Sequence, residues 1–197
     1  MSYHIYQTEG FILESRPLGE ANKSFLVFTK DLGMVRVSAQ GVRLQKSKLR
    51  YGLQDFCHSK ISLVRGKEVW RITNVSLIDN LHSIFKNDGE KMAVVARIFS
   101  LLVRLLHGEE ENAGLFNVLS GFMEFFKNQN LTNENKRNAE AIAVLRILNC
   151  LGYLGDGGEI SEFTKSPYFD AELLSKMSAV RRLAFEEINK SLKESHL

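Results

Sequence analysis

Met34-Val35-Arg36-Val37-Ser38-Ala39-Gln40-Gly41-Val42-Arg43-Leu44-Gln45-Lys46-Ser47-Lys48-Leu49-Arg50 is the stretch that decides the fold. Its first six residues alternate. Val35, Val37 and Ala39 lie on one face, and Met34, Arg36 and Ser38 lie on the other. A period of two predicts a half-exposed antiparallel strand. Residues 41–50 then bring four cations and no acid, and a connection of this kind indicates a surface that meets phosphate.

Similar strand-like runs flank this stretch on both sides, at residues 10–16, 24–29, 57–64 and 69–75. The short connections between them read Pro17-Leu18-Gly19, Lys30-Asp31-Leu32-Gly33 and Arg65-Gly66-Lys67. Glycine-containing turns of this length are typical of hairpins. Five short strands with tight hairpins among them predict a small closed or nearly closed β-barrel.

After Asp79 the apolar period changes from two to about 3.6, which indicates helices. The first apolar stripe, with Lys91, Arg97 and Arg104 off it, consists of Met92, Val95, Phe99, Leu102, Val103 and Leu106. Residues 115–126 and 139–151 predict two more helices. The second is apolar on nearly every side except Arg146 and Asn149, so it should be central and end at a Gly152 C-cap.

A last helix is expected over residues 170–192, with an inward face made of Val180, Leu183, Ala184, Ile188 and Leu192. The prediction is therefore an α+β chain, with a five-stranded barrel over residues 1–79 and an α-helical domain over residues 80–197. No long linker separates the two parts, which favours their packing together.

Charge is placed unevenly along the 197 residues, although the formal net charge is only +3. Lys and Arg outnumber Asp and Glu by 12 to 7 through Asn80, against 14 to 16 beyond it. The start of the chain has neither the basic nor the apolar part of a signal peptide, and Arg97 and Arg104 interrupt the longest apolar helix. We expect a cytoplasmic protein with no membrane segment, in which Cys57 and Cys150 are buried, reduced thiols.

Catalytic and metal-binding motifs are not evident. The five histidines, His4, His58, His82, His107 and His196, match no local triad or metal pair. Gly155, Gly157 and Gly158 follow a helix instead of opening one, so they predict a plain turn, and the acidic run at residues 109–111 predicts a solvated connection. We expect no metal and no cofactor.

A nucleic-acid surface is the favoured function for the cations. Arg43, Lys46, Lys48 and Arg50 lie in the long connection, Arg36 lies on the polar face of the strand before it, and Lys23, Arg65, Lys67 and Arg71 come from the same region, with only Glu68 and Asp55 near. Single strands also need aromatic faces to stack on. Phe25, Phe28, Tyr51 and Trp70 are available; such residues are more often barrel core, and Tyr51 is preferred because it ends the cationic stretch.

Several segments, taken in order, resemble the RecO family of bacterial recombination mediators. They are Glu9-Gly10-Phe11-Ile12-Leu13, Gly19-Glu20, Phe28-Thr29-Lys30, the Gly33 hairpin, Ala39-Gln40-Gly41-Val42-Arg43 with Lys46-Ser47-Lys48, Gly52-Leu53-Gln54-Asp55-Phe56, Trp70-Arg71-Ile72-Thr73, and Leu145-Arg146-Ile147-Leu148 with Leu151-Gly152-Tyr153. The resemblance is continuous through the N-terminal part and patchy beyond it.

This resemblance implies an N-terminal OB-fold, no catalytic site, binding to single- and double-stranded DNA and annealing of complementary strands. It also implies two partners, RecR and the acidic tail of single-stranded DNA-binding protein, and a role in loading recombinase. Arg43, Lys46 and Lys48 match the family's basic loop as DNA contacts; charge and position add Lys23, Arg36 and Arg50. Some members carry a four-cysteine zinc element where residues 154–159 have no cysteine, so zinc is not carried over.

Arg97 and Arg104 share a helical face beside Leu101, and this spacing suits an acidic peptide tail, although a solvated pair is the simpler interpretation. Three other functions stay open. The chain fits an RNA-binding or translation-associated OB protein without annealing activity. It also fits a small enzyme whose site brings together His58, His82, Asp79 and His107, or an adaptor whose cations serve solubility.

Overall fold

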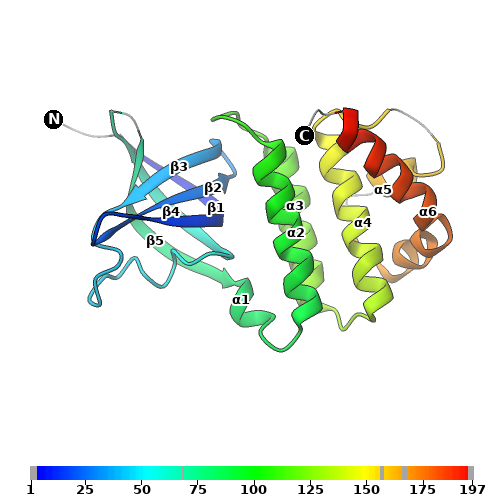
Figure 1. Cartoon of the computed structure of the whole chain (residues 1–197), viewed down its shortest axis with the longest axis horizontal. Helices are drawn as coiled ribbons and strands as arrows, with labels where there is room; N and C mark the ends of the chain where they lie inside the picture. The colour runs from blue at the N-terminus through cyan, green and yellow to red at the C-terminus, as the bar shows by residue number, and fades with distance from the viewer. Residues whose placement is uncertain (1–3, 68, 156–157, 166–167, 195–197) are drawn as a thin grey trace. The chain divides into compact units, whose positions relative to one another are not determined.

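The computed structural model describes residues 4–67, 69–155, 158–165 and 168–194 (Figure 1). Glu68, Gly157 and His196, named above, lie outside these ranges. The chain divides into two compact units, which are described separately. The barrel unit holds residues 1–87 and 106–113, and the helical unit holds residues 88–105 and 114–197.

Five strands form the barrel unit (Figure 1): β1 (Ile5–Leu18), β2 (Asn22–Thr29), β3 (Gly33–Ala39), β4 (Cys57–Arg65) and β5 (Trp70–Asn80). They close in the order β1-β2-β3-β5-β4. Neighbours are antiparallel except β3 and β5, which run parallel where Val37 pairs with Trp70 and Ser38 with Arg71. The five-stranded barrel and the α+β class are confirmed.

Closure of the barrel depends on β1, which is long enough to serve two neighbours. Residues 5–11 of this strand pair with β4, and residues 10–18 pair with β2. The register with β2 shifts between Ile12 and Glu14, and a bulge of this kind bends a strand and increases its twist. One strand thereby turns the corner between the two walls.

The barrel interior is filled by one face of each strand. The buried cluster contains Ile12, Phe25, Val27, Val35, Val37, Ala39, Ile61, Leu63, Trp70 and Ile72. Burying a large apolar side chain contributes about 1.5–3 kcal/mol, so these alternating positions fix the register. Met34 differs from the expected alternation: it is buried, because this outward position of β3 pairs with Phe28, which is also buried.

The helices are α1 (Leu81–Ile84), α2 (Gly89–Leu105), α3 (Ala113–Asn128), α4 (Asn133–Cys150), α5 (Ser161–Lys165) and α6 (Ala171–Glu194). α1 belongs to the barrel unit, and α4 is the centre of the helical unit because it packs against α2, α5 and α6. Thr132 caps its start by accepting a bond from the Asn135 amide. Gly152, with φ +75°, ends it as predicted, and the Tyr153 amide donates to the Leu148 carbonyl.

Two expectations about the helices were wrong. Lys91 is buried, not on the polar side of α2, because its ammonium donates to the carbonyls of Phe126 and Gln129 at the end of α3. Cys150 is exposed, because it lies in the last turn of α4, where the helix leaves its neighbours; Cys57 is buried as expected. In the described part of the chain, each helix is too short or too polar to cross a membrane.

Candidate nucleic-acid interface

The cationic stretch forms a long connection between β3 and β4, over residues 40–56, built from successive turns. The Leu44 amide donates to the Gly41 carbonyl, and the Ser47 amide donates to the Leu44 carbonyl, each at 3.0 Å. Gly41 opens the first turn with φ +64°, a conformation that glycine adopts without strain. Local hydrogen bonds therefore give this loop a defined path.

Apolar and polar anchors fix the loop to the barrel. Val42 and Leu53 are both buried in the barrel core. At the base of the loop, the side-chain oxygen of Asn22 accepts from the Gly41 amide at 2.9 Å, and the Arg43 amide donates to the Ala21 carbonyl at 3.0 Å. The anchoring role of Asn22 could not be identified from the sequence, because it depends on contact between the β1–β2 turn and the loop in the folded barrel.

Three of the expected cations meet at the mouth of the barrel. Lys23, Arg43 and Arg50 line a pocket of about 350 Å³ with Val42, Leu53 and Gln54. No acidic side chain lines this pocket among the residues that the structure describes. The Lys23 ammonium donates to the Ser15 hydroxyl at 3.1 Å, and Arg43 donates to the Gly19 carbonyl at 2.8 Å, which leaves the guanidinium with further donors for an anion.

The two middle cations of the loop, Lys46 and Lys48, are exposed. Tyr51, which follows the cationic stretch, is also exposed, at 74% of its surface. Phe25, Phe28 and Trp70 are buried, which confirms that they are core residues. We call Lys23, Arg43, Lys46, Lys48, Arg50 and Tyr51 the loop surface.

Arg36 does not join the loop surface. Lys23 pairs with Ala39, which faces the barrel interior, whereas Arg36 is three residues from Ala39 and points the other way. Arg36 therefore lies on the outer wall of the barrel. The predicted set of site residues is divided between two faces of the same sheet.

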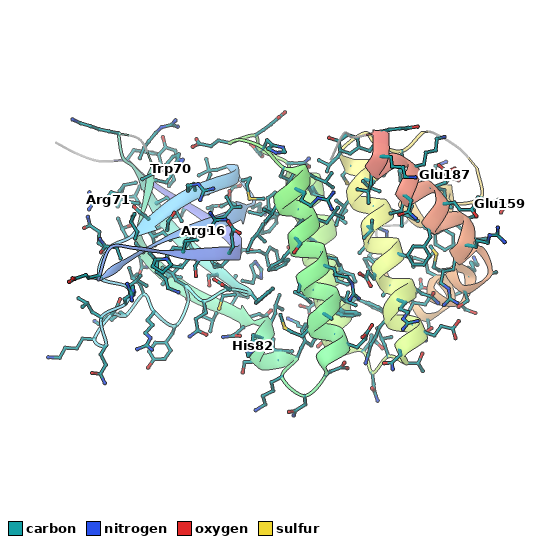
Figure 2. All side chains as sticks on the ribbon, viewed as in Figure 1. Arg16, Trp70, Arg71, His82, Glu159 and Glu187 are labelled. Carbon is teal, nitrogen blue, oxygen red and sulfur yellow. The ribbon has the colours of Figure 1, made fainter. Side chains whose placement is uncertain are left out.

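The outer wall carries a second cationic concavity that the sequence prediction left out of its site. This outer cleft, of about 650 Å³, is lined by Ser38, Gln40, Val64, Arg65, Gly66, Lys67, Arg71, Ile72 and Thr73. In the part of the chain that the structure describes, its lining contains no acidic side chain. Figure 2 labels Arg71 beside Trp70 on β5, with Arg16 on β1. The alternation of β5 predicts that the Arg71 side chain faces outward. Its position beside Ser38 depends on the parallel pairing of β3 and β5, which the sequence does not reveal.

Glu109 corrects the expectation of a merely solvated acidic run. Its carboxylate accepts from the Trp70 indole nitrogen at 3.0 Å and lies 3.5 Å from the Arg65 guanidinium. Arg65 in turn lies over the Trp70 ring, 5.1 Å from its centroid. The segment also passes close to Gly33, where a Cβ atom would come within 2.0 Å of the Glu110 carbonyl oxygen. The acidic run is thus fastened to the barrel beside the outer cleft.

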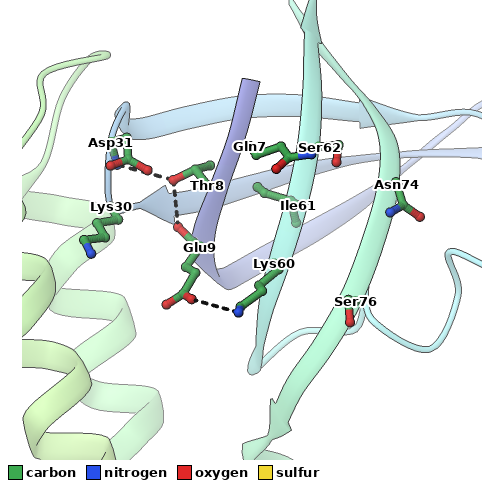
Figure 3. A pocket seen from close by; sticks show the side chains of 10 residues that line it. All are labelled: Gln7, Thr8, Glu9, Lys30, Asp31, Lys60, Ile61, Ser62, Asn74 and Ser76. Atoms are coloured by element: carbon green, nitrogen blue, oxygen red, sulfur yellow. Dashed lines mark hydrogen bonds and ion pairs between the residues drawn. The ribbon is translucent and has the colours of Figure 1, made fainter. Parts of the chain in front are cut away.

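A third concavity on the barrel has mixed charge (Figure 3). It measures about 380 Å³, and its lining consists of Gln7, Thr8, Glu9, Lys30, Asp31, Lys60, Ile61, Ser62, Asn74 and Ser76. Here Lys60 lies 3.7 Å from Glu9, and Thr8 accepts a hydrogen bond from the Asp31 amide. Because carboxylates accompany the lysines, this wall is poorly matched to a polyanion.

The helical unit brings together the residues expected to hold a peptide tail. Arg97, Leu101 and Arg104 line a groove of about 740 Å³ formed by α2, α4 and α6, with Arg137 and the half-exposed Phe185. Two carboxylates, Glu90 and Glu140, also line the groove, and both pair with Arg97. Arg97 donates two bonds to Glu140, at 2.6 and 2.8 Å, and these bonds raise the pKa of its guanidinium. Arg97 is therefore an internal tie, while Arg104 and Arg137 are exposed at the groove.

The residues of the enzyme alternative are partly grouped. His58 and Asp79 are register partners on β4 and β5, and His58 stacks on Phe11 with ring centroids 4.2 Å apart. His82 and His107 are both exposed. Among the residues that the structure describes, no three His, Cys, Asp or Glu side chains are grouped to hold a metal.

Comparison with known proteins gives a consistent family. A family model described as Recombination protein O N terminal matches residues 1–81. The chain is 26% identical to "DNA repair protein RecO" of Alkaliphilus metalliredigens over 130 residues, which cover 66% of this chain and 52% of that protein. It is 24% identical to the protein of the same name from Acetivibrio thermocellus over 147 residues, which cover 75% and 57%.

A further "DNA repair protein RecO", from a Roseiflexus species, is 28% identical over 193 residues, covering 93% of this chain and 66% of that protein. The chain spans about half the length of the first curated relatives that it matches. The family match coincides with the barrel, from β1 through β5, and identifies it as an OB-fold domain. The predicted resemblance to the RecO family is confirmed, by the family model over the barrel and by these relatives beyond it.

Proposed function

We propose that this protein is a DNA repair and recombination mediator that acts by binding DNA and not by catalysis. Its loop surface holds the phosphates of single- and double-stranded DNA, promotes annealing of complementary strands and, with RecR, helps to load recombinase. The observation that carries this proposal is the loop itself. Val42 and Leu53 anchor it in the barrel core, and two of its cations, Arg43 and Arg50, line a pocket without acidic side chains among the described residues.

The mechanism is electrostatic and needs no cofactor. Phosphate contacts hold a strand without reading its sequence, and neutralised phosphates let two strands approach each other. Tyr51 offers an exposed ring at the end of the loop, on which a base of either strand can stack. Four to six phosphate contacts predict a slope of about −3 to −4 for log affinity against log salt.

The groove of the helical unit supports a second part of the proposal, the acidic tail of single-stranded DNA-binding protein as partner. Leu101 and Phe185 give an apolar floor, and Arg104 and Arg137 give exposed cations for carboxylates. Arg97 keeps its role as a wall of this groove, held by Glu140. The proposed location of the protein is the cytoplasm, where these partners and DNA meet.

A salt titration of single-stranded DNA binding tests the proposal. The variant Arg43→Glu, Lys46→Glu, Lys48→Glu should lose at least about tenfold in affinity at low salt, and its salt slope should become shallower by about 2 because three contacts are lost. It should also fail to accelerate annealing of complementary strands. The matched control, Lys86→Glu, Lys190→Glu, Lys193→Glu, changes the charge equally at exposed positions elsewhere and should retain both properties.

The same experiment separates the alternatives. Equal DNA affinity in the two triple variants would contradict the proposal and favour an adaptor whose cations serve solubility. A clear preference for RNA over DNA single strands of the same sequence, without annealing activity, would favour an RNA-binding OB protein.

A further inference from the structure

The loop surface contains one concave part, the pocket at the mouth of the barrel. We call it the mouth pocket, and its lining consists of Lys23, Val42, Arg43, Arg50, Leu53 and Gln54. Lys23 comes from β2, and the other lining residues come from the connection between β3 and β4. Lys46 and Lys48 are exposed outside this lining. Folding therefore gathers three cations around one cavity and leaves two lysines on open surface.

Neutral groups, not carboxylates, hold two of the pocket cations in place. The Lys23 ammonium donates to the Ser15 hydroxyl at 3.1 Å, and Arg43 donates to the Gly19 carbonyl at 2.8 Å. A bond to a neutral acceptor orders a side chain without cancelling its charge. An ammonium has three donors and a guanidinium has five, so both side chains keep donors for an anion. Ordering them before binding also reduces the entropy that binding costs.

The rest of the lining adds a neutral donor and an apolar floor. The side-chain oxygen of Gln54 accepts from the Asn80 side-chain amide at 3.1 Å, so the NH₂ group of Gln54 is left to donate. Val42 and Leu53 are buried beneath the cations. Apolar surroundings lower the local dielectric constant and strengthen each charge interaction.

This chemistry fits a terminal phosphate better than a phosphate within a strand. A phosphodiester carries one negative charge. A phosphomonoester carries about 1.5 to 2 negative charges at neutral pH and presents three acceptor oxygens. Three cations around a single cavity match the larger charge, whereas Lys46 and Lys48 on open surface suit phosphodiesters that pass by.

We infer that the mouth pocket binds the terminal phosphomonoester of a DNA strand, while Lys46, Lys48 and Tyr51 contact the nucleotides next to that end. This inference rests on the proposed function and gives it a preferred ligand. Lys23, Arg43 and Arg50 set the preference. The protein therefore favours a strand that ends in phosphate over the same strand ending in hydroxyl groups.

Fluorescence anisotropy with three strands of one sequence tests the inference. The strands are about 12 nucleotides long, within the range of OB-fold site sizes, and are labelled internally. They carry a 5′-phosphate, a 3′-phosphate or hydroxyl groups at both ends. One phosphorylated strand should bind about tenfold more tightly than the hydroxyl strand near neutral pH, which is the effect of one added charge-assisted hydrogen bond.

Acid should abolish this preference. The second pKa of a phosphomonoester is about 6, so at about pH 5 the terminal phosphate carries one charge, as a phosphodiester does. No histidine or carboxylate lines the pocket in the part of the chain that the structure describes. Glu20 and Asp55, exposed carboxylates next to lining or contact residues in sequence, act on all three strands alike.

Matched variants of the loop surface separate the pocket from general charge. Lys23→Gln and Arg50→Gln should each reduce the preference to about twofold or less. Lys46→Gln and Lys48→Gln remove the same charge from open surface, so they should weaken binding of all three strands and keep the preference. Circular dichroism should show every variant folded.

The possible outcomes are distinct. Equal affinity of the wild-type protein for the three strands would overturn the inference and leave DNA binding by the loop intact. A preference that survives in both pocket variants would also overturn it, because the terminal phosphate would then bind elsewhere. If calorimetry showed thymidine monophosphate binding while the three strands bound equally, the pocket would belong to free nucleotides and not to strand ends. No binding of any strand would overturn the proposed function itself.

Discussion

The loop surface of the barrel unit and the interior of the helical unit use their cations in opposite ways. On the barrel, Arg43, Lys46 and Arg50 are exposed, and Arg43 and Arg50 line a pocket that has no acidic side chain among the described residues. In the helical unit, Lys91 and Arg146 are buried, and each donates to two backbone carbonyls. The exposed cations of the loop are therefore candidates for contact with a partner, whereas Lys91 and Arg146 hold the helical unit together.

Burial lowers the pKa of two cations in the helical unit. The Lys91 ammonium donates at 2.6 Å to two carbonyls at the end of α3, and its burial lowers its pKa. Burial lowers the pKa of Arg146 to about 10, although the guanidinium donates to the carbonyls of Phe163 and Tyr168 at 2.8 Å each. These cations are committed to internal contacts, so they cannot also serve a ligand.

Replacing Arg146 should have the largest effect, a loss of stability of the helical unit. Arg146→Ala leaves two carbonyls without their donor and removes a guanidinium stacked 4.1 Å from the Phe169 ring. The free energy of unfolding should fall by about 3 kcal/mol, and the Tm of the helical unit by more than about 10 °C. Differential scanning calorimetry measures both.

Arg182 provides the matched control, because it lies on α6 with a 94% exposed side chain and its ion pair with Glu186 lies within the same helix. Arg182→Ala should change stability by less than about 0.5 kcal/mol. If the two alanine variants unfolded at the same temperature, the buried cation would not be a structural tie.

The sequence predicted the barrel well because its information is local. Alternation at residues 34–39 and hairpin turns fix which side chains face inward, and burial of Val35 and Val37 follows from that pattern alone. Three features could not be predicted, because each depends on segments that meet only after folding. Ser38 meets Arg71 through a parallel pairing, Glu109 reaches Trp70 from a distant connection, and Lys91 meets the end of α3.

The candidate site was predictable in part for the same reason. The four cations of the loop follow directly from the printed sequence, whereas their division from Arg36 requires the register of β2 on β3. Helical periodicity placed Lys91 outside the apolar stripe, but a long side chain can carry its charge to carbonyls at a neighbouring helix end.

Tyr51 should give the next largest effect and tests whether the loop surface uses more than charge. Tyr51→Ala removes an exposed ring and should weaken single-stranded DNA binding by about 2 kcal/mol, or about 30-fold, if a base stacks there. Tyr51→Phe keeps the ring and should bind normally. Fluorescence anisotropy at constant salt measures both, and equal affinity of the alanine and wild-type proteins would show that the ring takes no part.

Replacing Glu109 should have a smaller effect and should increase DNA affinity instead of decreasing it. Glu109→Gln removes the ion pair with Arg65 but keeps an oxygen for the Trp70 indole, so Arg65 becomes available to phosphate at the outer cleft. DNA affinity should rise about fivefold, or about 1 kcal/mol. Glu111→Gln changes the same charge in the same segment and should change affinity less than about twofold. Equal gains in both variants would reduce the effect to net charge.

Replacing Arg50 should change DNA affinity least among these variants. Its main effect should be on the salt dependence of binding. Arg50 lines the pocket at the mouth of the barrel together with Lys23 and Arg43. Arg50→Ala should therefore remove a single phosphate contact and make the slope of log affinity against log salt shallower by about 0.7. Arg50→Lys should restore the slope, because one charge suffices for counterion release. Arg146→Lys should leave the slope unchanged, since a cation committed to carbonyls releases no counterions when DNA binds. The same slope change at both positions would remove the distinction between exposed and committed cations.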